Sequence, residues 1–146
     1  MNAKDYLGQA YRIDQRINCK IEQVSSLHSL ATKATTTVSD MPGSPTRNTH
    51  RMENIIVKIL DIEEEINTEI TSLVDLKAEI MGVIKGLDNL EFQMLLELRY
   101  LCYKPWEQIA LDLNYSVNNI FKMHKRALEE LEVSSTYKGI ISSKNN

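Results

Sequence analysis

Apolar residues recur at seven-residue intervals along the first third of the chain. They form two rows that lie three positions apart, which is typical of a helix that buries one face against a partner helix. The rows contain Ala3, Ala10, Ile17, Val24 and Ala31, and Tyr6, Ile13, Leu27 and Ala34, with Lys20 in the one charged place. This pattern predicts a first long helix that ends before residue 35.

The same pattern returns after residue 52 and predicts a second helix over 52–85. Its rows contain Ile59, Ile66, Leu73, Ile80 and Leu87, and Ile55, Ile62, Leu76, Val83 and Leu90, with Glu69 in the charged place. At a rise of 1.5 Å per residue, each helix would be about 45–50 Å long. We therefore expect residues 1–86 to form an extended antiparallel helical hairpin of the coiled-coil type.

Residues 35–49 separate the two patterns and contain two prolines, a glycine and several Ser and Thr residues. This composition predicts a loop. The loop is long for a connection between helices, and two interpretations remain open: a disordered tether, or a segment with a function of its own.

Lys20 and Glu69 are charged residues in otherwise apolar rows. If the chain folds back near residue 43, residue 20 lies opposite residue 66, within one helical turn of Glu69. We predict that the two side chains meet and help to fix the register of the helices. The alternative is that both side chains extend outward and never meet.

The apolar stripe of the second predicted helix is wider than a two-helix contact requires. Ile56, Ile70 and Ile84 flank the main rows, with Val74 nearby. Because an isolated hairpin would bury little apolar surface relative to its ordering cost, we expect this stripe to be covered. A homodimer formed through the hairpin is the favoured hypothesis.

A compact unit is predicted over residues 87–133, with a flexible tail at 134–146. The long periodicity ends near Gly86, and an apolar helix over 89–101 follows. Pro105 favours a new helix start. Ser116 is a good N-cap for a further helix, with Asn114-Tyr115 as the turn before it. Two short helices around a tight turn, with small Ala110 inside, describe a helix-turn-helix. The expected fold is all-α: a long antiparallel hairpin followed by this C-terminal unit.

The residues of the C-terminal unit resemble region 4 of the sigma-70 family, which reads promoter −35 elements. The resemblance rests on Leu98-Arg99-Tyr100, Trp106-Glu107-Gln108-Ile109-Ala110, Leu113, Ser116, Ile120 and Arg126-Ala127-Leu128. The wider arrangement, with Glu63-Glu64-Glu65-Ile66 and Val74-Asp75-Leu76-Lys77 ahead of it, resembles small phage and prophage proteins of Gram-positive bacteria related to phage late-gene transcription activators. The aromatic-rich sigma region that melts the −10 element has no counterpart.

The resemblance implies that the helix after Ser116 enters the major groove of DNA. The implied contact residues are Lys104, Ser116, Val117, Asn118, Asn119, Phe121, Lys122, Lys125 and Arg126. Val117 and Phe121 stand where sigma factors often have arginine, which removes bidentate guanine contacts. Asn118 or Asn119 suits adenine, and an apolar side chain suits a thymine methyl group, so an AT-leaning site is expected.

The chain as a whole is acidic, with 17 basic and 20 acidic residues and a net charge of −3, which argues against bulk coating of nucleic acid. The charge is unevenly placed. Lys122, Lys125 and Arg126 lie between Ser116 and Leu128, where no carboxylate occurs. The alternative is an ordinary solvated helix face, or pairing of Arg126 with glutamates further along the helix.

Four nearby residues carry further expectations. His124 is expected to add charge at lower pH. Trp106 suits core packing, or with Lys104 a phosphate contact at the helix start. Arg99 is expected either to contact the DNA backbone or to pair with a neighbouring glutamate.

Catalytic and metal-binding patterns are missing from the sequence. Cys19 and Cys102 are far apart, and His28, His50 and His124 are scattered. No glycine-rich phosphate loop, secretory signal or membrane-length apolar run occurs. We therefore expect a cytoplasmic protein that is not an enzyme, has no cofactor or metal, and does not enter a membrane. The resemblance to phage proteins implies that this cytoplasm is that of the bacterial host cell.

Three functions remain open at this point. The leading hypothesis is a phage-type transcriptional regulator that binds double-stranded DNA. The second is an adaptor that binds bacterial RNA polymerase, because sigma region 4 also contacts polymerase. The third is a small terminase-like subunit that recognises viral DNA, although such proteins usually carry the DNA-binding motif first.

Overall fold

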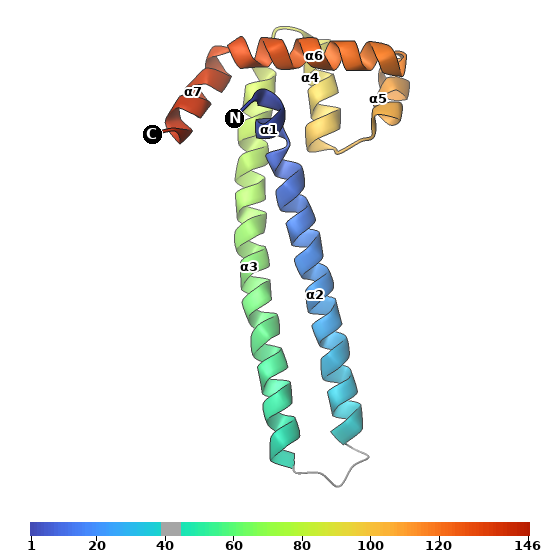
Figure 1. Cartoon of the computed structure of the whole chain (residues 1–146), viewed down its shortest axis with the longest axis vertical. Helices are drawn as coiled ribbons and strands as arrows, with labels where there is room; N and C mark the ends of the chain where they lie inside the picture. The colour runs from blue at the N-terminus through green and yellow to red at the C-terminus, as the bar shows by residue number, and fades with distance from the viewer. Residues whose placement is uncertain (39–44) are drawn as a thin grey trace. The chain divides into compact units, whose positions relative to one another are not determined.

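A computed structural model describes the backbone of residues 1–38 and 45–146, and the side chains of residues 1–33 and 50–146. Throughout the described backbone the chain is helical and has no strand (Figure 1), which confirms the predicted all-α class. The helices are α1 (Ala3–Leu7), α2 (Gln9–Val38), α3 (Pro45–Lys85), α4 (Leu90–Leu96), the π-helical turn η1 (Glu97–Leu101), α5 (Trp106–Leu113), α6 (Val117–Val133) and α7 (Ser135–Lys144).

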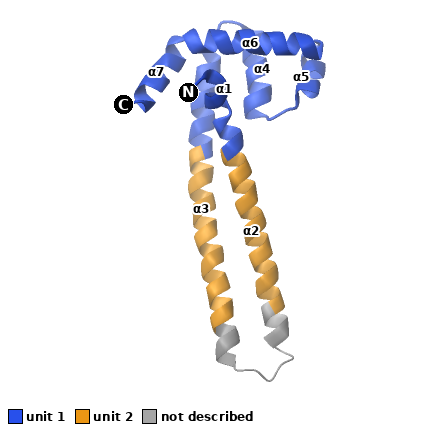
Figure 2. Ribbon diagram, viewed as in Figure 1, with its two compact units in different colours: residues 1–12, 73–146 blue, residues 13–72 orange. Residues whose placement is uncertain are grey.

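The chain divides into two compact units (Figure 2). Unit 1 contains residues 1–12 and 73–146, and unit 2 contains residues 13–72. This division differs from the predicted boundary after residue 86, because the start of α2 and the last turns of α3 belong with the C-terminal helices. No helix in the described parts of the chain is both long and apolar enough to cross a membrane.

In unit 2, α2 and α3 lie side by side and run in opposite directions (Figure 2). Ile17, Ile59 and Ile66 are buried between them. The predicted meeting of Lys20 and Glu69 is confirmed, with Lys20 Nζ 2.9 Å from Glu69 Oε1. Hydrogen bonds from Lys20 and then Arg16 hold the pKa of the Glu69 carboxyl below its usual value.

The predicted loop over 35–49 is too long at both ends. Helix α2 continues to Val38, and α3 already begins at Pro45, a residue that suits a first helical position because its missing N–H has no partner there. Residues 39–44, the remainder of the predicted loop, lie outside the described residues.

The predicted first helix is interrupted near its start. Asn2 caps α1 by accepting a hydrogen bond from the Asp5 N–H, and α1 ends at Leu7, with Gly8 as the C-cap before α2 begins. Ala3, Tyr6 and Leu7 of this short helix are fully buried. Burying a large apolar side chain contributes about 1.5–3 kcal/mol to the free energy of folding. These buried residues therefore make α1 part of the unit 1 core.

The core of unit 1 is built from helices distant in sequence. Its fully buried large side chains are Tyr6, Leu7, Ile80, Val83, Ile84, Leu95, Leu96, Ile109, Ile120 and Leu131. Helix α6 supplies the longest wall and packs on α1, α4, α5 and α7.

The segment predicted to be a flexible tail, residues 134–146, instead contains helix α7, and this expectation was wrong. Ser134 caps the helix by accepting a hydrogen bond from the Tyr137 N–H. Tyr137 is buried, packs edge-on against Tyr6 and donates its hydroxyl hydrogen bond to the Met1 carbonyl at 3.0 Å. An N-cap and one aromatic anchor therefore order a segment whose apolar periodicity is weak.

Candidate nucleic-acid interface

Helices α5 and α6 are joined by a turn of three residues, Asn114, Tyr115 and Ser116. Asn114 adopts the left-handed conformation with φ 63°, which Asn tolerates better than most residues. The Tyr115 N–H donates to the Ala110 carbonyl at 3.0 Å, which gives a hydrogen-bond partner to one of the last carbonyl groups of α5. Ser116 then caps α6 by accepting a hydrogen bond from the Asn119 N–H, as predicted.

The start of α5 differs from the prediction by one residue. Pro105 was expected at the first helical position, but its ψ of 155° is extended and the helix begins at Trp106. Beneath the turn, Ile109 and Ala110 of α5 pack in the core with Ile120 of α6. The small Ala110 side chain allows close approach of the two helices.

The outer face of α6 brings most of the predicted contact residues together. Residues three and four apart share a helix face, so these positions form one surface. Asn118, Asn119, Phe121, Lys122, Lys125 and Arg126 are exposed, whereas Val117 is half-buried. Ser116 is exposed, but its side-chain oxygen serves the cap.

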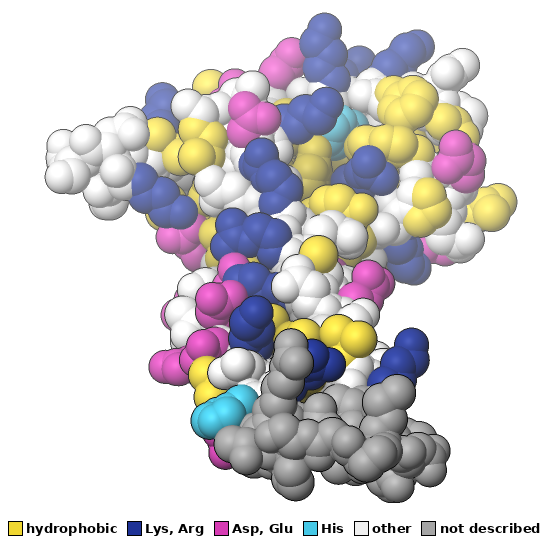
Figure 3. Space-filling view, turned by 60° about the horizontal axis from the view of Figure 1, so that its bottom comes forward, with side chains coloured by type: hydrophobic (Ala, Val, Ile, Leu, Met, Phe, Trp, Pro, Cys, Tyr) yellow, Lys and Arg dark blue, Asp and Glu magenta, His cyan; other side chains and the backbone are white. Residues whose placement is uncertain are grey.

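Three cations on this face lack an acidic partner. Among the side chains that the structure describes, no carboxylate lies within ion-pair distance of Lys122, Lys125 or Arg126. On the face that Figure 3 shows, basic, acidic and apolar side chains are interspersed. The three cations of α6 instead follow one another along a helix face without a carboxylate between them.

Lys104 is engaged within the protein. Its Nζ lies 2.8 Å from Asp112 Oδ2, and this bond raises the pKa of Lys104. Gln108 donates a second hydrogen bond to Asp112 at 2.8 Å. Of the predicted contact residues, Lys104 is thus held against α5 by a carboxylate of that helix.

Trp106 forms the centre of an aromatic cluster. The Phe121 ring meets it edge-on at 5.4 Å, and the His124 ring does so at 4.7 Å. The Arg99 guanidinium lies 4.3 Å from the centre of the Trp106 ring. Phe121 remains 47% exposed, so part of its ring still faces outward. The cluster joins α5 to the first half of α6.

The expectation that His124 adds charge at lower pH was wrong. Burial, together with the nearby charges of Lys4 and Arg99, lowers its pKa to about 4. The His124 Nε2 atom lies 2.6 Å from the Tyr100 hydroxyl. The ring is therefore a neutral packing element between η1 and α5.

The sequence did not predict two features near this face. Arg99 was expected to contact the DNA backbone or a glutamate, but it donates a hydrogen bond to the Lys104 carbonyl at 3.0 Å and stacks on Trp106. Lys4 of α1 is exposed and close enough to His124 to affect its pKa. Nothing in the periodicity indicated that the N-terminal helix would approach α6.

The turn that carries Arg99 and Tyr100 is π-helical. The Cys102 N–H donates to the Glu97 carbonyl at 3.0 Å, which is a bond across five residues. Arg99 and Tyr100 lie in this turn and contact Trp106 of α5 and His124 of α6. Within the described residues, no group of three His, Cys, Asp or Glu side chains is placed to hold a metal ion.

Comparison with known proteins identifies one family. No curated protein and no solved structure matches the chain. A family model described as a protein of unknown function, DUF1492, matches residues 17–132. That match covers most of the chain, including α3, η1, α5 and nearly all of α6. The chain therefore belongs to the DUF1492 family of proteins of unknown function.

Proposed function

We propose that this protein is a phage-type transcriptional regulator that binds double-stranded DNA through α5 and α6, which act as a sigma region 4-like helix-turn-helix. The observation that carries the proposal is the outer face of α6, where Lys122, Lys125 and Arg126 are exposed without acidic partners. Phosphate contacts supply most of the affinity of DNA-binding proteins, and exposed cations supply those contacts.

The geometry of α6 suits the major groove. An α-helix fits into that groove, and the N-terminal residues of a recognition helix contact the base edges. Asn118 and Asn119 occupy the first turn of α6 and are exposed. In the proposed complex one of them reads adenine, while the cations further along the helix contact phosphates.

Lys4 is a further exposed cation close to α6. It lies on α1, which packs on α6. We assign Lys4 a phosphate contact in addition to those of α6. Lys104 contributes less to binding than the sequence implied, because Asp112 neutralises it.

A homodimer through the hairpin would present the DNA-binding face in pairs. Unit 2 supports this part of the proposal with exposed apolar side chains on α3. Ile56, Leu60 and Ile70 are 47%, 58% and 41% exposed. Covering such side chains removes apolar surface from water and favours association.

A polymerase-binding adaptor is the second candidate function. Leu90 and Met94 of α4 and Leu111 of α5 are exposed at 71%, 51% and 73%. Exposed large apolar residues on two helices favour contact with a protein surface. In that case the α4 and α5 faces, and not the outer face of α6, would carry the main interaction.

A selection of random duplex DNA against the purified full chain at two salt concentrations tests the proposal. We expect an enriched, AT-leaning sequence. If each subunit neutralises about four phosphates, the logarithm of the affinity falls with the logarithm of the salt concentration at a slope of about −3.6 per subunit. Absence of both an enriched sequence and a salt dependence would overturn DNA binding and favour the adaptor.

A further inference from the structure

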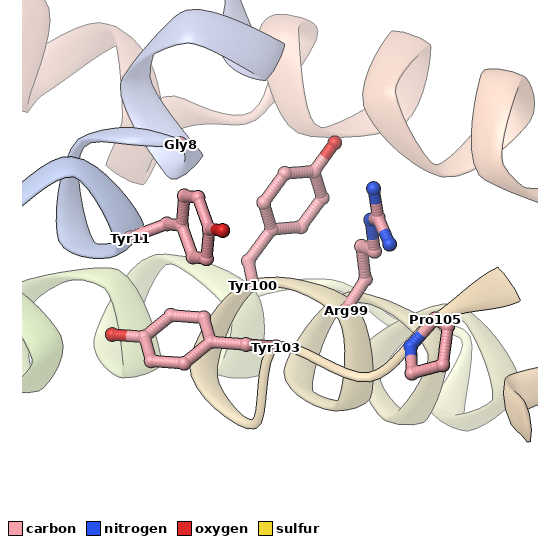
Figure 4. Close-up of a pocket in the computed structure, with 6 residues that line it drawn as sticks. All are labelled: Gly8, Tyr11, Arg99, Tyr100, Tyr103 and Pro105. Carbon is pink, nitrogen blue, oxygen red and sulfur yellow. The ribbon is translucent and has the colours of Figure 1, made fainter. Parts of the chain in front are cut away.

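A pocket of about 380 Å³ opens within unit 1. Its lining residues come from the start of α2, from η1 and from the segment that leads into α5 (Figure 4): Gly8, Tyr11, Arg99, Tyr100, Tyr103 and Pro105. Ligand pockets commonly measure about 300–1,000 Å³, so this one suits a molecule of one or two rings. The proposed DNA contacts do not use it.

Three tyrosine rings form the walls. Figure 4 shows Tyr11, Tyr100 and Tyr103 around one space, with the Arg99 side chain beyond Tyr100. Tyr11 and Tyr103 meet edge-on with ring centres 5.4 Å apart. The Tyr11 side chain is 49% exposed, so this wall of the pocket is open to solvent. Aromatic walls of this kind favour a flat aromatic ligand, which can pack in offset or edge-on geometry.

Arg99 gives the pocket a positive charge. Its guanidinium uses one N–H for the Lys104 carbonyl and stacks on Trp106, and no carboxylate lies among the lining residues. A guanidinium has five N–H donors, and its planar shape matches a carboxylate. A cation without a counter-ion at the wall of an aromatic pocket favours an anionic group on the ligand.

Tyr103 adds a strained, unsatisfied group. Its φ of 58° is uncommon for an aromatic residue, and strained residues cluster at binding sites. Its hydroxyl is buried and has no hydrogen-bond partner among the described residues. Lys77 Nζ lies 4.7 Å from the ring centre. Figure 4 shows this hydroxyl pointing away from Arg99 and Tyr100, so Tyr103 contributes its ring, and not its hydroxyl, to the pocket wall.

We propose that this pocket binds a small aromatic carboxylate, whose ring packs among Tyr11, Tyr100 and Tyr103 and whose carboxylate binds Arg99. The proposal joins the aromatic walls and the guanidinium without a counter-ion in one site.

A ligand bound in the pocket would contact residues that pack directly on α5 and α6. Arg99 stacks on Trp106 of α5, and the Tyr100 hydroxyl bonds His124 of α6. A ligand on Arg99 and Tyr100 therefore holds η1 against both helices, and DNA affinity changes with ligand. This consequence rests on the proposed function, whereas binding of the ligand itself does not.

Trp106 allows the binding to be tested without DNA, because it is the only tryptophan in the chain and contacts Arg99. The purified full chain is titrated with benzoate, salicylate and indole-3-carboxylate, and binding is followed by Trp106 fluorescence and calorimetry. Cyclohexanecarboxylate, which lacks the aromatic ring, and benzamide, which lacks the charge, are the matched controls. We expect saturable binding of the aromatic carboxylates and at least about tenfold weaker binding of both controls.

Two variants locate the site. Tyr11→Ala removes a half-exposed wall residue and is expected to weaken binding about tenfold, whereas Tyr115→Ala, outside the pocket, leaves it unchanged. Arg99→Gln should abolish the preference for the carboxylate over benzamide. If Arg99→Gln fails to fold by circular dichroism, the Tyr11→Ala result decides.

Three outcomes would overturn the proposal: no saturable binding at millimolar concentration, equal binding of cyclohexanecarboxylate, or unchanged binding to Tyr11→Ala. A separate DNA titration, with and without salicylate, distinguishes the two proposals. If the protein binds no DNA in either condition but Trp106 still reports saturable binding, the proposed function fails and the ligand site stands.

Discussion

Lys20 Nζ and Glu69 Oε1 lie 2.9 Å apart across the α2–α3 contact of unit 2. Arg16 and Glu65 complete the cluster, with Arg16 2.7 Å from Glu69 and Lys20 3.3 Å from Glu65. Each of the two central residues takes the one charged place in an apolar row of its helix. Their contact therefore ties one position of α2 to one position of α3.

A double-mutant cycle on this pair should show strong coupling. Lys20→Met leaves the largely buried Glu69 carboxylate with one cation fewer, and Glu69→Leu leaves Lys20 beside Glu65 alone. We expect each single variant to lower the melting temperature by about 5 °C. The double variant should recover most of that loss, because two apolar side chains replace a paired charge. Additive losses, measured by circular dichroism, would contradict the coupling.

Neutralising the cations of α6 should weaken DNA binding in a salt-dependent way. Each of Lys122→Gln, Lys125→Gln and Arg126→Gln is expected to reduce the salt slope of affinity by about 1, since each removes one phosphate contact. Lys138→Gln, an exposed lysine of α7, is the matched control and should leave the slope unchanged. Equal effects of all four variants in fluorescence anisotropy would argue against a specific role for α6.

Acid should destabilise the protein through His124. Its pKa is lowered from 6.5 to about 4 in the folded chain, so the unfolded chain binds a proton first as pH falls. Stability that is present at neutral pH is therefore lost between about pH 6.5 and pH 4. Allowing for solvent screening of a half-buried ring, the loss is about 1–2 kcal/mol.

Urea unfolding at pH 7 and pH 4.5 measures this loss. His124→Gln should remove most of this part of the pH dependence, whereas the exposed His28→Gln should retain it. An unchanged pH dependence in His124→Gln would show that other groups control the acid response.

The turn between α5 and α6 requires a left-handed residue at position 114. Asn114→Ala should destabilise the protein by about 1–2 kcal/mol, because the Cβ of alanine crowds the backbone at φ 63°. Asn114→Gly should be nearly neutral, since glycine adopts this conformation freely. Thermal unfolding of the two variants makes the comparison, and equal losses would exclude backbone strain as the cause.

The proposed dimer predicts a particle mass of about twice 16.8 kDa by light scattering at micromolar concentration. Leu60→Glu with Ile70→Glu should weaken association at least about tenfold, because charges would enter the apolar contact. Val133→Glu, at an apolar position on α6 that is more exposed than either, should have no effect. A monomeric wild-type mass would contradict the dimer.

The sequence predicted features that depend on local pattern and on one long-range pairing. Seven-residue periodicity indicated α2 and α3, and the two charged exceptions identified the Lys20–Glu69 contact. Cap chemistry identified Ser116 as the N-cap of α6, and Pro105 located the start of α5 within one residue. Such features are encoded in spacing along a single helix or in residues adjacent to a turn.

Features that depend on contacts between distant segments could not be predicted in this way. Helix α7 depends on Tyr137 packing against Tyr6 and Met1, far away in sequence. The neutral state of His124 depends on burial under η1 and α1. The contacts of Arg99 with Trp106 and with the Lys104 carbonyl are made from a π-helical turn, which the periodicity of the sequence did not predict.

The π-helical turn of η1 also restricts how the length of this segment can vary within the family. Deleting one residue from 97–101 would remove the bond across five residues and restore ordinary α-helical bonding. The positions of Arg99 and Tyr100 within the turn would then change relative to Trp106 and His124, which they contact. Substitutions in this turn should therefore be tolerated more readily than a change of a single residue in its length.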